Sequence, residues 1–157
     1  MIAKIGDTIP NCAGKQNLTV TLLWWKEGEI SVDGPYIDGY YTFTAKPGMK
    51  FIILAYEFCN NGIEEQTTPY LNVGEVVTAP RGYYYEIFTP PSGIHSEEYK
   101  PRKATAEEID TLIGNSGGYE DLLPEESVKG CVVFEIPEDA MPVEADIIEL
   151  QPYLVKF

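Results

Sequence analysis

The fold class is decided by the stretch Leu122-Leu123-Pro124-Glu125-Glu126-Ser127-Val128-Lys129-Gly130-Cys131-Val132-Val133-Phe134-Glu135-Ile136-Pro137-Glu138-Asp139-Ala140-Met141-Pro142. It contains a turn, a half-buried strand and a second turn. In an extended chain, one face carries Val128, Gly130, Val132, Phe134 and Ile136, and the other carries Lys129, Cys131, Val133 and Glu135. Pro124 and Pro137 bracket the strand, because proline has no amide hydrogen to donate to a ladder. This pattern is typical of a β-sandwich, and nothing in it resembles an active site.

Other segments repeat the pattern of an extended chain. Further strands are predicted at 18–25, 40–44, 50–59, 72–78, 82–88, 143–150 and 153–157. In the central strand 50–59, the core face carries Ile52, Leu54, Tyr56 and Phe58. The turn Ala79-Pro80-Arg81-Gly82 predicts a hairpin. We therefore expect one all-β domain over residues 1–157, an immunoglobulin-like antiparallel β-sandwich of two packed sheets.

Two adjacent tryptophans lie at the end of the first long strand. By alternation, Trp24 shares a face with Leu22, whereas Trp25 shares the opposite face with Leu23. We expect one of these rings to be buried and the other to be partly exposed.

One segment carries a helical signal. The sequence Thr105-Ala106-Glu107-Glu108 predicts a capping box, in which the Thr105 hydroxyl accepts from the Glu108 amide and the Glu108 carboxylate accepts from the Thr105 amide. Apolar residues then recur at helical spacing, and Gly114 ends the segment. We predict one short helix near 106–113, within an insertion of about 89–121, that plugs an open end of the two sheets.

A resemblance to a known family rests on two stretches. The first is Lys46-Pro47-Gly48-Met49-Lys50-Phe51-Ile52-Ile53-Leu54-Ala55-Tyr56-Glu57-Phe58-Cys59-Asn60-Asn61-Gly62, and the second is the strand quoted above. Together they resemble the telokin-like domain of unknown function that is grouped with immunoprotective extracellular proteins. The resemblance spans about two thirds of the chain and implies an exported immunoglobulin-like sandwich without established catalysis. The insertion 89–121 does not fit the short connection usual in that family.

The composition indicates a folded and strongly acidic domain. Hydrophobic residues make up 44% of the chain, and the formal net charge is −14 at pH 7. Residues 1–52 hold five acidic and five basic residues, so the excess of 20 acidic residues over 6 basic ones lies in residues 53–157. Such a surface repels phosphate backbones, so nucleic-acid binding is not expected. The favoured explanation of the acidic excess is solubility, and the alternative is attraction of a cationic partner.

The compartment depends on whether Met1 is the native start. No segment approaches the ~20 consecutive apolar residues of a membrane-spanning helix. Gly6 and Asp7 interrupt the chain before the apolar run of a signal peptide could develop. The family resemblance implies an extracellular or cell-envelope location with a leader absent from this chain, whereas a native Met1 implies the cytoplasm. The three cysteines, Cys12, Cys59 and Cys131, allow one bridge between the last two, but separate thiols are favoured.

Catalytic motifs are weak. Gly114-Asn115-Ser116-Gly117-Gly118 matches the G-x-S-x-G pattern, and His95, Asp110 and Ser116 follow the chain order of trypsin-like proteases. A nucleophile elbow needs a strand before the serine, however, and here a helix is expected. His95 and Ser116 are also too close in sequence for the two-barrel protease scaffold. We therefore predict that the chain is not an enzyme, with a hydrolase that uses the 89–121 insertion as the alternative.

Neither a cofactor nor a metal is expected. His95 is the only histidine, and no second cluster of metal ligands accompanies it. Asp33 and Asp38 could offer oxygen ligands to calcium, but their spacing fits no EF-hand, and turn formation explains both Asp-Gly pairs.

The sequence leaves three functions open. The favoured one is a non-catalytic extracytoplasmic module that binds a protein or a cell-envelope component, and the others are the hydrolase and a purely structural envelope domain. The candidate binding residues are aromatic: Tyr83, Tyr85 and Trp25. In a strand, Tyr83 and Tyr85 share one face and Tyr84 takes the other, so one aromatic face can remain exposed. The alternative is that these tyrosines pack beneath the insertion.

Overall fold

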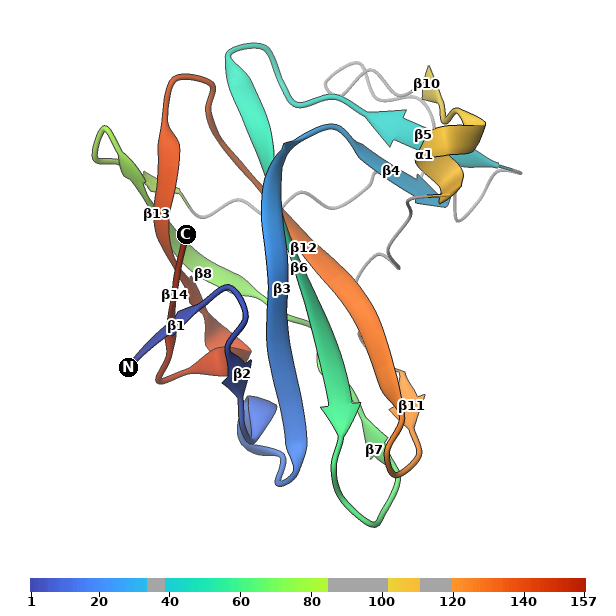
Figure 1. Cartoon of the computed structure of the whole chain (residues 1–157). Helices are drawn as coiled ribbons and strands as arrows, with labels where there is room; N and C mark the ends of the chain where they lie inside the picture. The colour runs from blue at the N-terminus through green and yellow to red at the C-terminus, as the bar shows by residue number, and fades with distance from the viewer. Residues whose placement is uncertain (34–38, 85–101, 111–119) are drawn as a thin grey trace.

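The computed structural model describes residues 1–33, 39–84, 102–110 and 120–157 (Figure 1). The strands are β1 (Ile2–Lys4), β2 (Thr8–Ile9), β3 (Leu18–Gly28), β4 (Ile30–Asp33), β5 (Tyr40–Phe43), β6 (Met49–Asn60), β7 (Gln66–Thr67), β8 (Val73–Ala79), β9 (Tyr83–Tyr84), β10 (Arg102–Lys103), β11 (Asp121–Leu122), β12 (Ser127–Pro137), β13 (Met141–Ile147) and β14 (Leu154–Lys156). The helical elements are α1 (Ala106–Asp110) and two 3-10 turns, Cys12–Gly14 and Ile148–Leu150.

Two sheets form the sandwich. One has the strand order β12-β6-β3-β2 and the other the order β1-β14-β13-β8-β9. Neighbouring strands are antiparallel except β1 and β14, which are parallel. The predicted β-sandwich with one short helix is thereby confirmed. The expected hairpin is also present, since β8 pairs with β9 and the Thr78 amide donates to the Gly82 carbonyl at 3.1 Å.

The main core lies between these two sheets. The predicted core faces of β6 and β12 are both buried there, and the register pairs Val132 with Leu54 and Phe134 with Ile52. Leu54 is 0% exposed and Phe134 is 1% exposed, so each removes close to its whole apolar surface from water. Burial of that size contributes about 1.5–3 kcal/mol per side chain.

A third sheet, which the sequence did not predict, covers part of the outer face of the β12-β6-β3 layer. Its strand order is β10-β5-β4, and Figure 1 shows it beside the sandwich together with α1. A second core lies beneath it, made of Ile30, Tyr41, Phe43, Phe51, Ile53, Cys131 and Val133. The strand β12 is therefore buried on both faces over much of its length, instead of being half-buried as its alternation indicated.

Lys129 and Glu135 lie on the same face of β12 but differ in burial. Lys129 is exposed, as expected for the face opposite the main core. Glu135 lies on the same face but is only 3% exposed, and its carboxylate accepts a hydrogen bond from the Lys46 amide at 3.3 Å. A buried carboxylate requires such donors, since an uncompensated one is costly.

A β-bulge reverses the predicted positions of the tryptophans. The pairing of β3 with β6 shifts between Leu22 and Trp24, which leaves Leu23 as the extra residue. A shift by one residue turns every later side chain to the opposite face. Trp25 therefore packs on the main core, and Trp24 packs on the second core. The expectation that one ring is buried is also wrong, because both are half-buried.

The predicted helix is present, but it packs against a different part of the fold than predicted. Within the described residues, α1 spans Ala106–Asp110, and its Glu108 contacts Ser31 of β4 and Thr42 of β5. It therefore lies against the third sheet and does not plug an end of the sandwich. The Glu108 amide donates to the Thr105 hydroxyl at 3.3 Å, which confirms one half of the capping box.

The described parts of the insertion contribute to two strands. Arg102–Lys103 form β10, which pairs with β5, and Asp121 pairs with Thr67 of β7. Residues 89–101 and 111–119 of the insertion lie outside the described residues.

Candidate ligand-binding cleft

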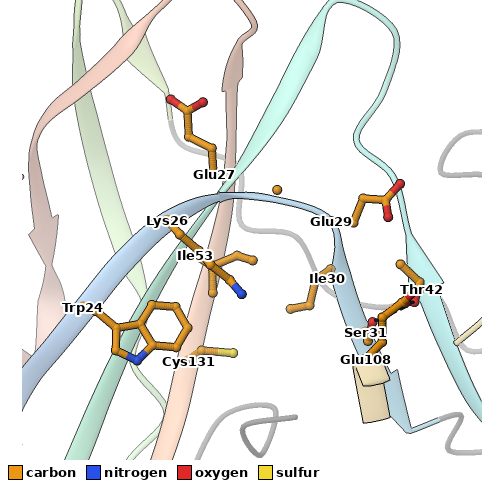
Figure 2. Close-up of a pocket in the computed structure, with 11 residues that line it drawn as sticks. Trp24, Lys26, Glu27, Glu29, Ile30, Ser31, Thr42, Ile53, Glu108 and Cys131 are labelled. Atoms are coloured by element: carbon orange, nitrogen blue, oxygen red, sulfur yellow. Dashed lines mark hydrogen bonds between the residues drawn. The ribbon is translucent and has the colours of Figure 1, made fainter. Parts of the chain in front are cut away.

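A cleft of about 320 Å³ opens where β3 turns into β4, between the sandwich and the third sheet (Figure 2). We call it the junction cleft. Its lining residues are Trp24, Lys26, Glu27, Gly28, Glu29, Ile30, Ser31, Thr42, Ile53, Glu108 and Cys131. In Figure 2, Trp24 and Cys131 lie on the sandwich side of the cleft, and Ser31, Thr42 and Glu108 lie on the third-sheet side. The volume is within the usual range of small-ligand sites, about 300–1,000 Å³.

Gly28 allows the chain to cross from one wall to the other. Its φ of +151° lies outside the conformations that side-chain-bearing residues readily adopt. Glu27 and Glu29 flank it, so both carboxylates stand at the rim of the cleft. The bend thus folds β4 over the sheet and brings acidic residues to the mouth of the cleft.

The sandwich wall is mostly apolar. Trp24 and Ile53 both belong to or pack against the second core, and Cys131 is 7% exposed. The Lys26 ammonium lies over the Trp24 ring, 5.2 Å from its centroid, which is the geometry of a cation–π contact.

The third-sheet wall is polar and ordered by Glu108. Its carboxylate accepts hydrogen bonds from the Thr42 hydroxyl, from the Ser31 hydroxyl at 3.1 Å and from Arg102 at 2.9 Å. The bond from Thr42 and then the bond from Arg102 lower the pKa of Glu108 to about 2, because both stabilise the ionised form. Glu108 is therefore a carboxylate at neutral pH and cannot serve as a general acid there.

The rim carboxylates are paired with cations. Glu29 lies 2.8 Å from Arg102, which also holds Glu108, and Glu27 lies 2.7 Å from Lys50. Arg102 thus joins the insertion to the β3–β4 turn. Because these pairs are partly exposed, each contributes little to stability, but together they fix the positions of the rim side chains.

The thiol at the base of the cleft is held in its neutral form. Burial raises the pKa of Cys131 to about 11, and Lys26 opposes that shift. Since the thiolate is the nucleophile, Cys131 is unreactive at neutral pH. None of the three cysteines forms a disulfide: the register places Cys131 opposite Ala55 and Cys59 opposite Ser127, so the expectation of separate thiols is confirmed.

The predicted binding residue Tyr83 lies in β9, in the sheet of the sandwich that does not line the junction cleft. Tyr83 is 45% exposed, its ring is 5.4 Å from the Arg81 guanidinium, and its hydroxyl accepts from Arg81 at 2.7 Å. Tyr84 packs against the main core, so the two side chains take opposite faces as expected. Tyr85 lies outside the described residues.

Trp25, the third predicted binding residue, does not join Tyr83 in one site. It packs on the main core, whereas Tyr83 projects from β9 with its side chain exposed. The aromatic residue that lines the junction cleft is its neighbour Trp24.

His95 and Ser116 of the hydrolase alternative lie outside the described residues, as does Asp38 of the calcium hypothesis. In the part of the chain that the structure describes, no group of three or more histidine, cysteine, aspartate or glutamate side chains is arranged to hold a metal ion. Nor do the described residues include a helix with the length and apolar character needed to cross a membrane.

The cleft has almost no signature in the sequence, because its walls come from distant segments. Ser31, Thr42 and Glu108 belong to three elements and meet only after β4 has folded over β6. The one local signal is Glu27-Gly28-Glu29, where a glycine interrupts an extended run and marks a bend.

Comparisons with known proteins support the fold and match no family. No protein-family model matches the chain, and no curated protein matches it. The resemblance to the telokin-like family is therefore not confirmed. Among solved structures, an uncharacterized beta-sandwich protein from Clostridium difficile 630 is similar, with a TM-score of 0.54 and 13% sequence identity over 100% of this chain and 95% of that chain. At that identity, the likeness shows that the chain shares the β-sandwich fold.

Proposed function

We propose that the chain is a non-catalytic, immunoglobulin-like module that works outside the cytoplasm and binds its ligand in the junction cleft. The observation that carries the proposal is the composition of that cleft, which combines a half-buried tryptophan, hydroxyl groups and fixed carboxylates. Concave sites with an apolar wall and a few oriented polar groups are the usual form of ligand sites.

The chemistry of the cleft argues for binding rather than catalysis. Cys131 holds its proton at neutral pH, and Glu108 has already lost its own. Neither has a pKa near 7, which is what an efficient acid or base at neutral pH requires. The extracytoplasmic location rests on the resemblance of two strands to an exported family, and fractionation of the source cells with an antibody tests it.

Ligand-observed NMR with a fragment library tests the binding site. The library contains apolar, hydroxylated, cationic and anionic fragments, and it is applied to the wild type, Trp24→Ala and Tyr83→Ala. We expect fragments that bind the wild type to lose their signal in Trp24→Ala and to keep it in Tyr83→Ala. Loss of the signal in Tyr83→Ala but not in Trp24→Ala would place the binding site at Tyr83 instead. Turnover of ester or amide fragments by the wild type would contradict the absence of catalysis.

A further inference from the structure

The junction cleft is balanced in charge, which restricts its ligand. It is lined by three carboxylates, Glu27, Glu29 and Glu108, and all three are ion-paired, with Lys50 or with Arg102. A cationic ligand would have to compete with those existing pairs. An anionic ligand would approach three carboxylates whose partner cations are already engaged, and Lys26 is the only cation among the described residues that line the cleft. A ligand without net charge avoids both costs.

The third-sheet wall also disfavours a wholly apolar ligand. Glu29 offers an exposed carboxylate at the rim and Ser31 a half-buried hydroxyl. Thr42 is buried, and the Glu108 carboxylate already accepts hydrogen bonds within the wall. A hydrocarbon that covered Glu29 and Ser31 would strip water from these two groups without replacing its hydrogen bonds, which would weaken its binding. The ligand therefore needs hydroxyl or amide groups along one side.

The apolar sandwich wall favours a ligand with an apolar face on the side that contacts this wall. The Trp24 ring attracts the Lys26 ammonium through its electron-rich face. Polarised C–H bonds are attracted by the same face. Lys26 is exposed, so its flexible side chain can move aside when a ligand packs on the ring.

We propose, building on the binding function above, that the junction cleft takes a neutral carbohydrate ring. A pyranose combines the required features, because one face carries C–H bonds and its edges carry hydroxyl groups that both donate and accept hydrogen bonds. Its C–H face packs on Trp24, and its hydroxyl groups bond to Glu29 and Ser31. The free sugar and a glycan chain offer the same chemistry to the cleft.

Chemical-shift mapping of the whole chain tests the ligand class. The protein is titrated with three neutral disaccharides, maltose, cellobiose and diacetylchitobiose, and separately with glucosamine, glucuronate and benzyl alcohol. We expect at least one neutral disaccharide to give saturable shifts of the amides of Ser31, Thr42 and Ile53. A longer oligomer of that sugar distinguishes the source, since a rise in affinity with length indicates a glycan chain and a constant affinity indicates a free sugar.

Variants assign the contacts. Trp24→Ala should weaken the disaccharide at least tenfold, and Lys129→Ala, an exposed residue outside the cleft, should leave its affinity unchanged. Ser31→Ala, which removes one hydroxyl, provides a milder second variant if Trp24→Ala loses the dispersed spectrum of a folded chain. We expect it to weaken binding several-fold.

The outcomes separate the ligand class from the proposed function. If benzyl alcohol shifts the cleft amides and no neutral disaccharide does, the carbohydrate class is wrong and the binding function stands. Tighter binding of glucosamine or glucuronate than of every neutral sugar would also overturn the class. If no probe shifts these amides, both the carbohydrate class and the binding function fail.

Discussion

The ring of Trp25 meets the ring of Phe157 edge to face, with centroids 5.5 Å apart and planes inclined by 88°. Phe157 in turn lies 5.8 Å from Phe134, so three rings connect β3, the last residue and β12 across the main core. This row exists because the bulge at Leu23 turns Trp25 inward. Trp25 therefore contributes to packing between the sheets.

Loss of the Phe157 ring should destabilise the sandwich. We expect Phe157→Ala to lower the free energy of unfolding by about 2 kcal/mol, because the ring is half-buried and makes two aromatic contacts. Phe157→Leu, which keeps much of the apolar surface, is the control and should lose less. Urea denaturation measures both, and a wild-type midpoint for Phe157→Ala would show that the ring row is unimportant.

The register of the central strands gives a second prediction. Phe134→Ala and Leu54→Ala should each cost about 2–5 kcal/mol, because both side chains are fully buried in the main core. Lys129→Ala, at an exposed position of the same strand as Phe134, should change stability little. Equal denaturation midpoints for Phe134→Ala and Lys129→Ala would contradict the register of β12.

Alkaline pH should destabilise the fold through two buried thiols. Burial raises the pKa of Cys12 to about 12 and that of Cys131 to about 11, from an ordinary value of 9.0. A raised pKa means that the folded state holds the proton more tightly, so the stabilisation is complete below pH 9 and is lost as pH rises toward 11. Denaturation between pH 7 and pH 11 should show a decline that begins near pH 9.

Replacing the thiols provides the control for that decline. Cys12→Ala and Cys131→Ala should each flatten the curve above pH 9, while lowering stability at pH 7 through lost packing. Tyr56, whose pKa is also raised by burial, sustains the remaining slope. An identical slope in the wild type and in both variants would show that the thiols ionise as readily in the fold as in the unfolded chain.

Glu108 should titrate well below an ordinary glutamate. Its carboxyl pKa is lowered from 4.5 to about 2, so its contribution to stability is present above pH 4.5 and is lost as pH falls through 2. The carboxyl carbon, followed by NMR, should therefore show a midpoint near 2. Thr42→Val removes the hydroxyl with the largest effect and should raise that midpoint. A wild-type midpoint near 4.5 would mean that the Thr42–Glu108 contact does not form in solution.

The sandwich itself could be predicted because its signals are local. Ile52, Leu54, Tyr56 and Phe58 alternate along one strand, and their periodicity alone indicates a buried face. The capping threonine of α1 was likewise visible, since Thr105 and Glu108 lie within one helical turn.

The third sheet and the cleft could not be predicted, because they depend on contacts between distant segments. Cys131 and Val133 look like the weaker face of a half-buried strand until β4 and β5 cover them. The bulge at Leu23 has no sequence signature of its own, yet it decides which tryptophan faces the cleft. Alternation locates side chains only as long as the pairing register continues unbroken.

The third sheet covers one end of the outer face of the β12-β6-β3 layer and leaves the other end open. Cys131 and Cys59 lie on that same face, and only Cys131 belongs to the second core. The most direct test is alkylation of the native protein with iodoacetamide at pH 8, with the labelled peptides quantified by mass spectrometry. We predict that Cys59 is alkylated many times faster than Cys131, and that this difference disappears in urea. Equal rates in the native protein would contradict the cover, and with it the junction cleft.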